Sequence, residues 1–173
     1  WLHRYPSRYS SANNHLVAEG LGLLLAGSLF PDADHAADYR AEGRRILQEQ
    51  AALQILPDGV GAEQSPTYQA FTMEMLAFAA LVGEVLGQPL EAIVTDRLSA
   101  GATFLRSLMD EAGACPEIGD NDEGRVIGCP PDREPRYVAS VVAAVAGLVR
   151  DPHLAPPARD VHLRDHLFAA PDA

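Results

Sequence analysis

The sequence predicts an all-α protein made of antiparallel helical hairpins in two layers, as in a bundle, a solenoid or a toroid. Hydrophobic residues make up 47% of the chain and aromatic residues only 6%, a balance rich in Ala and Leu that favours helices over a β-sandwich. Apolar residues recur every three or four positions in several long segments, which is the helical period. No segment shows the strict apolar–polar alternation of a half-buried strand.

The first two predicted helices differ in how much of their surface is apolar. One starts after the candidate N-caps Ser10 and Ser11 and ends near Phe30. It is apolar on nearly all sides, which is typical of a buried helix. The next helix has one apolar face and one face of arginine and glutamate, which is typical of a surface helix. It is predicted over residues 34–55, and the later helices are predicted over 67–86, 90–110, 137–149 and 158–169.

A long irregular segment over residues 111–136 separates the fourth predicted helix from the fifth. It is rich in Gly, Pro and acidic residues, and loops of this length without regular structure are often functional. Cys115 and Cys129 lie within it. Their spacing is compatible with a disulfide that closes the loop, and equally with two buried thiols.

Charge and hydropathy exclude some classes of function. The formal net charge is −11, which argues against a nucleic-acid-binding protein because such proteins carry a basic surface. The longest apolar stretch, residues 21–30, is much shorter than the roughly 20 residues that span a bilayer, so no transmembrane helix is predicted. The chain starts with Trp1 and is interpreted as a segment of a longer protein. The oligomeric state stays open.

A first cluster of polar residues lies where the first predicted helix begins. Asn13, Asn14 and His15 follow two serines and come directly before the apolar run. Free backbone N–H groups and the helix dipole make such an N-terminus a good place for an anion. Asn and His side chains there are suited to binding a substrate carboxylate. Helix capping by Ser11 or Asn13 is the alternative interpretation.

A second cluster leads into the third predicted helix. Ser65 is a candidate N-cap and Pro66 occupies a position that favours a first helical residue. Tyr68 then lies in the first turn. Its phenol has an ordinary pKa of about 10, and cationic or hydrogen-bonding partners can lower that pKa so that the group shuttles protons. An amphipathic core tyrosine is the alternative.

A third cluster, residues 116–125, lies in the long irregular segment. Asp120, Asp122 and Gly124 alternate as in a calcium loop, but Pro131 stands where an EF-hand needs its bidentate Glu. We therefore disfavour calcium, and expect Arg125 to form an ion pair with one of the two aspartates in a cleft. His162 and His166 lie four apart without a third metal ligand, and both are predicted to be surface residues. No metal site is predicted.

In order and spacing, three segments together resemble the heparinase II/III-like family of polysaccharide lyases. They are residues 10–19, 58–68 and 116–125, and the first also resembles the related alginate lyases. The resemblance covers roughly residues 1–150. It implies an incomplete (α/α) toroid followed by a β-sheet domain. Residues 1–173 are therefore expected to form a single helical domain, a fragment of a larger toroid whose β-sheet domain is missing.

The resemblance also implies cleavage of an anionic, uronic-acid-containing polysaccharide by β-elimination, without a cofactor and in the periplasm or outside the cell. Asn14 and His15 would neutralise the uronate carboxylate and acidify the C5 proton. Tyr68 would act as base at C5, as acid to the leaving oxygen, or as both. Gln69 stands where the family usually has histidine. The remaining implied cleft residues are Asn13, Glu63, Gln64, Asp120 and Arg125.

Two other functions are compatible with the same fold, because a fold does not fix a function. One is a non-catalytic carbohydrate-binding or scaffolding segment, and the other is a helical module that binds a protein partner. The lyase hypothesis predicts that Asn14, His15, Tyr68 and Arg125 converge on one groove. The interaction hypothesis predicts that they are dispersed and that an exposed apolar patch is the binding surface.

Overall fold

The computed structural model describes residues 2–9, 12–122, 124–128, 136–159 and 161–168. Within these ranges all regular structure is helical, as predicted. An isolated bridge between Ile55 and Gly61 is the single strand-like pairing in the described ranges. The helices are α1 (Asn14–Leu29), α2 (Ala36–Gln54), α3 (Pro66–Val85), α4 (Ala92–Leu108), α5 (Tyr137–Leu148), the 3-10 turn η2 (Pro152–Leu154) and α6 (Leu163–Phe168).

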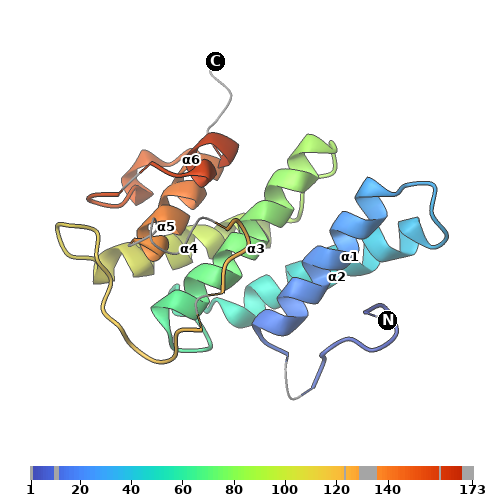
Figure 1. Cartoon of the computed structure of the whole chain (residues 1–173), viewed down its shortest axis with the longest axis horizontal. Helices are drawn as coiled ribbons and strands as arrows, with labels where there is room; N and C mark the ends of the chain where they lie inside the picture. Colours follow the sequence, from blue (N-terminus) through green and yellow to red (C-terminus); the bar gives the residue numbers. More distant parts are fainter. Residues whose placement is uncertain (1, 10–11, 123, 129–135, 160, 169–173) are drawn as a thin grey trace.

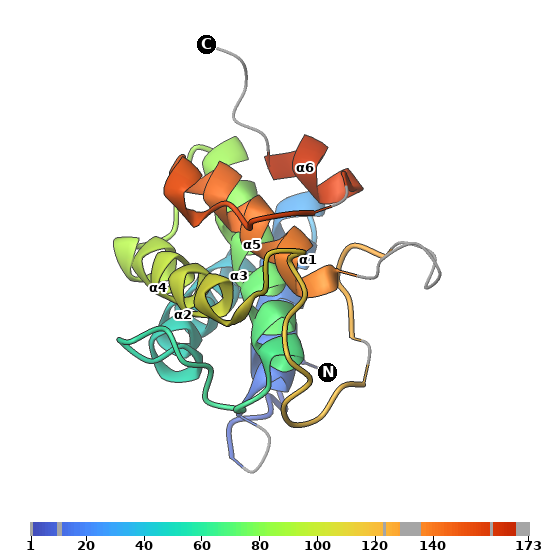
Figure 2. The same ribbon diagram turned by 90° about the vertical axis from the view of Figure 1, so that its left-hand side faces the viewer.

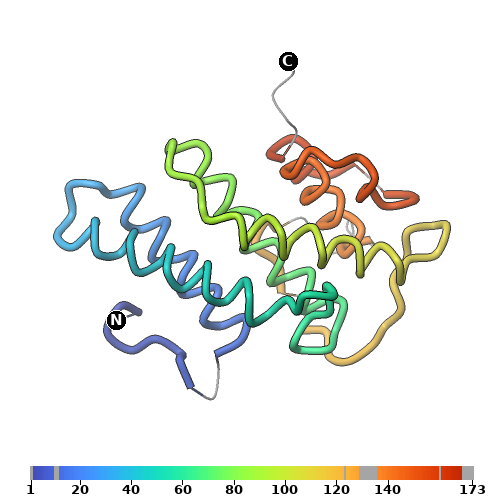
Figure 3. Tube along the Cα trace, turned by 180° about the vertical axis from the view of Figure 1, so that it is seen from behind, coloured from blue at the N-terminus to red at the C-terminus, as the bar shows by residue number. Residues whose placement is uncertain are grey.

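The helices are arranged as consecutive hairpins. Helix α1 packs against α2, α3 against α4, and α5 against α6. Contacts of α3 with both α1 and α5 join the hairpins in one layer, and α2 packs against α4 in the other. Helices α1 and α3 run in the same direction, so their N-termini lie at the same end of the two hairpins (Figures 1 and 3). The two predicted clusters of polar residues are therefore brought to one side of the molecule.

Helices α1 and α2 lie close together because both have glycine at their crossing. A Cβ on Gly43 of α2 would lie 2.5 Å from the backbone nitrogen of Leu24 and 2.6 Å from the carbonyl oxygen of Gly20. A Cβ on Gly20 would lie 2.7 Å from a methyl carbon of Ile46. Close helix packing of this kind holds the buried α1 in place, and with it the helix N-terminus that carries Asn14.

The Gly43→Ala variant is expected to unfold more easily, by about 1–3 kcal/mol, because a methyl group meets backbone there and forces the helices apart. Gly22→Ala is the matched control, since its Cβ would meet only Leu2, at 3.6 Å. That control is expected to gain about 0.5–1 kcal/mol from helix propensity. Urea denaturation of both variants measures the difference, and equal effects would contradict the packing argument.

The N-terminal caps of α1 and α3 can be compared with the predicted ones. The candidate caps Ser10 and Ser11 lie outside the described residues, and α1 is capped by Asn13, whose side chain accepts a hydrogen bond from the backbone N–H of His15 at 3.1 Å. Helix α3 begins as predicted. The hydroxyl of Ser65 accepts from the N–H of Tyr68 at 3.3 Å, and Pro66 is the first helical residue.

Of the last predicted helix, 158–169, the described residues show the six-residue helix α6. This helix lies over α5 on the side away from α2 (Figure 2). The prediction that His162 is a surface residue is wrong, because it is only 8% exposed; His166 is exposed. Two residues further along from His162, Arg164 is completely buried. A charged side chain in the core of so short a helix indicates that a buried partner holds it there.

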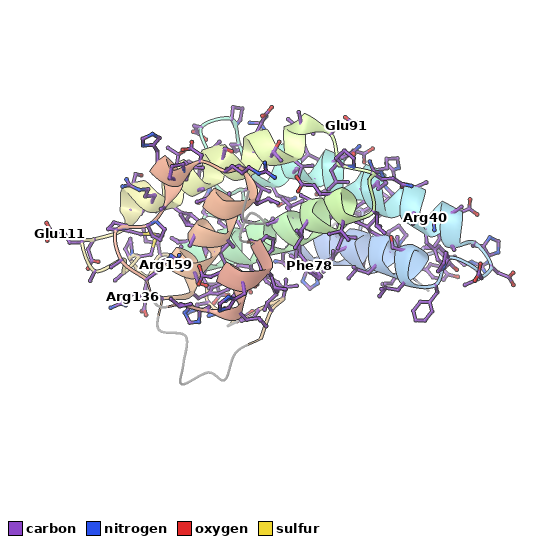
Figure 4. All side chains as sticks on the ribbon, turned by 90° about the horizontal axis from the view of Figure 1, so that it is seen from above. Arg40, Phe78, Glu91, Glu111, Arg136 and Arg159 are labelled. Atoms are coloured by element: carbon purple, nitrogen blue, oxygen red, sulfur yellow. The ribbon has the colours of Figure 1, made fainter. Side chains whose placement is uncertain are left out.

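The long segment after α4 crosses from one end of the molecule to the N-terminus of α3 (Figure 1). It starts near Glu111, which lies at the end of the molecule opposite to Arg40 (Figure 4). It then reaches Ser65, whose hydroxyl donates to the carbonyl oxygen of Asp120 at 2.7 Å. In the described ranges no helix has both the length and the hydropathy needed to cross a membrane.

Candidate active site

A pocket of about 380 Å³ lies where the N-termini of α1 and α3 meet the long loop. Six of the eight predicted site residues line it and two do not. Gln64 is an exposed residue with a left-handed backbone (φ 55°), and Arg125 lines a neighbouring pocket. The lining residues are Asn13, Asn14, His15, Glu63, Thr67, Tyr68, Phe71, Asp120, Asp122 and Gly124.

Asn14 is fixed by the carboxylate of Glu63. Its side-chain amide donates to both Glu63 oxygens, at 3.1 and 2.8 Å, and its backbone N–H lies 3.3 Å from one of them. A carboxylate already occupies the hydrogen-bond donors at the start of α1, where sequence reasoning placed a substrate anion. This contact makes Glu63 a direct partner of Asn14 rather than only a wall of the cleft.

Gln69 holds the loop that carries Glu63. Its side chain is buried, accepts from the N–H of Gly61 at 2.9 Å and donates to the carbonyl oxygen of Gly59 at 2.7 Å. The position at which Gln69 replaces the family's usual histidine therefore supports the loop backbone from inside. Among the described contacts of Gln69, none reaches the pocket lining.

Tyr68 is bound by an aspartate that the sequence reasoning did not include among the site residues. Its hydroxyl donates to Asp122 at 2.5 Å. This hydrogen bond, with smaller contributions from burial and from the nearby charges of Asp120 and Glu63, raises the pKa of Tyr68 to about 12. The sequence-based expectation that its partners lower the pKa is therefore wrong for this arrangement, because these partners are anions, which favour the neutral phenol.

The Asp122→Asn variant is expected to lower the pKa of Tyr68 from about 12 toward about 10. Asn keeps the shape and an accepting oxygen but removes the negative charge. In the wild type the raised pKa stabilises the folded state fully below the unfolded value of about 10, and this stabilisation is lost as the pH rises through about 12. NMR titration of labelled tyrosine, with Tyr68→Phe to assign the signal, measures the change. An unchanged pKa would contradict the role of Asp122.

Arg125 lines a different pocket from Asp120 and Asp122, the aspartates with which an ion pair was expected. Its guanidinium lies 3.5 Å from the centroid of the Tyr137 ring, a cation–π contact. It lines a second pocket of about 350 Å³ together with Arg136 and Cys115. Burial raises the pKa of the Cys115 thiol to about 11. The choice between a disulfide and two thiols also involves Cys129, which lies outside the described residues.

The first pocket has a negative lining. Glu63, Asp120 and Asp122 contribute carboxylates, and His15 is the one side chain among its described lining residues that can become positively charged. The acidic lining is suited to hydrogen-bonding hydroxyl groups of a sugar. An anionic ligand is expected to bind with its charged group at Asn14 and His15, where the helix dipole favours it.

Sequence reasoning missed a buried ion pair behind the pocket. Glu74 in the middle of α3 is 1% exposed, and Arg164 of α6 lies 2.5 Å from it. Glu74 interrupts an otherwise apolar run, and a charge at a core position of a helix indicates a buried partner. That signal was present in the sequence, but it did not identify the partner 90 residues away.

Comparison with known proteins shows the family to which the chain belongs. Residues 2–110, which include Asn14, His15 and Tyr68, match the family described as Heparinase II/III N-terminus. The chain belongs to this family. It is also similar to a heparin-sulfate lyase of Bacteroides stercoris, with 29% identity over 79 residues, which are 46% of this chain and 12% of that protein. The heparinase II/III-type chain thus covers a small part of that relative's length. No solved structure matches it.

Proposed function

We propose that this chain is the helical part of a polysaccharide lyase that cleaves an anionic, uronic-acid-containing polysaccharide by β-elimination. One observation carries the proposal: Asn14 and His15 of α1 and Tyr68 of α3 line the same pocket. These are the residues to which the family resemblance gives catalytic roles. The similarity to a heparin-sulfate lyase supports an anionic polysaccharide as substrate.

In the proposed mechanism the uronate carboxylate binds at the N-terminus of α1. Asn14 and His15 donate hydrogen bonds to it, and the charge that develops on the carboxylate during the reaction is stabilised by these donors. This lowers the pKa of the C5 proton. Because Glu63 already binds the amide of Asn14, the substrate carboxylate takes up a position beside Glu63 or displaces it.

Tyr68 is proposed to act as the acid. Its pKa of about 12 keeps the phenol protonated at neutral pH, which is the form that can donate a proton. A base takes the C5 proton, the bond from C4 to the glycosidic oxygen breaks, and Tyr68 protonates the leaving oxygen. A role as base would require the phenolate, and therefore the loss of the hydrogen bond to Asp122. The proposed chemistry involves no cofactor.

The remaining expectations belong to the same proposal. The chain is proposed to be one helical domain of a larger incomplete toroid that continues into a β-sheet domain. Apolar side chains exposed at the C-terminal ends of α1 and α3, namely Leu29, Phe30 and Val85, support further helices packing there. A polymeric substrate supports a periplasmic or secreted location. Asn13 and Asp120, which line the pocket, are proposed to contact the sugar.

The test is an assay of the full-length protein against a panel of purified uronic-acid polysaccharides. Elimination creates a conjugated double bond that absorbs in the ultraviolet, so an increase in absorbance on one polymer is the expected result. Binding of the same polymers is measured in parallel. Binding without any increase would favour the non-catalytic carbohydrate-binding module, and neither binding nor an increase on any polymer would contradict the proposed substrate class.

A further inference from the structure

Glu74 collects four hydrogen bonds in the core of the molecule. Its carboxylate accepts from the backbone N–H groups of Val126 at 2.8 Å and Ile127 at 3.2 Å. It also accepts from the hydroxyl of Tyr137 at 2.9 Å and from Nε of Arg164 at 2.5 Å. A buried carboxylate that accepts from so many donors has a fixed position.

Arg164 binds the same short stretch of the loop from the other side. While its Nε donates to Glu74, its Nη2 donates to the carbonyl oxygen of Ile127 at 2.8 Å, and its Nη1 lies 3.3 Å from the hydroxyl of Ser140. The Glu74–Arg164 pair therefore holds both backbone N–H groups of Val126–Ile127 and one of its carbonyl groups. Because Arg164 belongs to α6, its hydrogen bonds to Glu74 and Ile127 form only when that helix is docked.

Val126 and Ile127 closely follow the loop residues that line the pocket. These lining residues, Asp120, Asp122 and Gly124, are called the wall below. Gly124 packs on the ring of Phe71, where an added Cβ would lie 3.1 Å from a ring carbon. Asp122 binds the hydroxyl of Tyr68. On the upstream side, the carbonyl oxygen of Asp120 is held by Ser65. In the described part of the loop, the wall residues thus lie between two attachment points, one at Ser65 before α3 and one at the Glu74–Arg164 pair.

The wall needs such attachment for an electrostatic reason. Asp120, Asp122 and Glu63 line the same pocket, and like charges at short distance repel one another. The residues of the wall in the described ranges form no helix or strand whose hydrogen bonds could hold them in place. The hydrogen bond between Asp122 and Tyr68 therefore depends on attachments elsewhere.

We propose that Glu74 and Arg164 are positioning residues for the candidate active site. Their hydrogen bonds to the backbone of Val126 and Ile127 hold the wall that carries Asp122. In this way they couple the docking of α6 to the hydrogen bond between Asp122 and Tyr68. Neither residue lines the pocket, and both act through the loop. The link to catalysis rests on the proposed function, but the link to Tyr68 does not.

The first test uses the unmodified full-length protein. The amide hydrogens of Val126 and Ile127 are expected to exchange with solvent at least about tenfold more slowly than the amide of Asn121 in the same loop. The reason is that breaking their hydrogen bonds to Glu74 requires opening of the core. The amide of Asn121 donates to the side chain of Asp120, which is exposed. Equal exchange rates for the three amides would overturn the proposal.

The second test is the Arg164→Lys variant. Lysine keeps the charge but has one ammonium group, which cannot bind Glu74, Ile127 and Ser140 as the guanidinium fork does. The NMR-titrated pKa of Tyr68 is expected to fall from about 12 toward about 10, while a cooperative melting transition shows that the protein is folded. Arg45→Lys is the matched control, since Arg45 pairs with Glu42 and Glu49 on the surface of α2.

The outcomes separate this proposal from the proposed function. A folded Arg164→Lys protein in which the pKa of Tyr68 stays at the wild-type value would overturn the positioning role, even if the wild type is an active lyase. A lowered pKa in Arg164→Lys but not in Arg45→Lys would support it, even if no polymer is cleaved. If Arg164→Lys does not fold, the exchange rates of the wild type decide.

Discussion

The Tyr68→Phe variant is expected to lose about 10²–10⁴-fold in the rate of elimination, the usual contribution of a general acid or base. Phe lacks the proton that the leaving oxygen needs. The fold should persist, because the lost hydroxyl binds Asp122 at the pocket rather than in the core. Binding of the polysaccharide should change little, since Asn14 and His15 are the residues proposed to hold the carboxylate. The measurement compares kcat and KM with those of the wild type.

Tyr9→Phe is the matched control for this variant. Tyr9 is 93% exposed and is not among the residues that line the pocket, so the same chemical change there should leave kcat and KM unaltered. If Tyr68→Phe kept a rate close to that of this control, proton transfer by Tyr68 would be contradicted, and the acid would have to be sought among the carboxylates of the pocket.

The Arg164→Met variant is expected to lower the free energy of unfolding by about 3–5 kcal/mol, because it leaves the carboxylate of Glu74 buried without its charged partner. Urea denaturation measures the loss. The double variant Glu74→Gln with Arg164→Met should recover part of it, since it removes the unpaired charge.

An exposed ion pair provides the comparison for the buried one. Arg45 bonds Glu42 and Glu49, and 43% of its side chain is exposed, so Arg45→Met is expected to cost at most about 1 kcal/mol. The side-chain hydrogen bond to Glu42 raises the pKa of Arg45 above its usual range, but solvent screening keeps the expected cost small at this exposed site. A similar cost for Arg45→Met and Arg164→Met would contradict the account of the buried pair.

The helices were predictable because their pattern is local. The all-round apolar character of residues 16–25 requires burial whatever the partner, and the glycines and prolines that end the helices act through their own backbone. Ser65 was identified as a cap because the serine and proline are adjacent in sequence. The start of α1 was harder to predict, since Ser10, Ser11 and Asn13 were all able to cap it, and the structure uses Asn13.

The site was only partly predictable, because it is formed by tertiary contacts. Helix direction brings Asn14 and Tyr68 to the same pocket, and the motifs that carry them were visible in the sequence. The path of the long loop was not, so Asp122 rather than Arg125 reaches the pocket. The direction of the pKa shift of Tyr68 depends on that one difference, because an arginine near a phenol lowers its pKa and an aspartate raises it.

The mass of the products from a purified uronic-acid polysaccharide tests the central claim most directly. Elimination adds no water, so the account predicts oligosaccharides with a new unsaturated uronate at the non-reducing end, formed by the wild type and absent with Tyr68→Phe. Saturated products that have gained one water per cut would show hydrolysis, and would contradict the assignment of this pocket to a lyase.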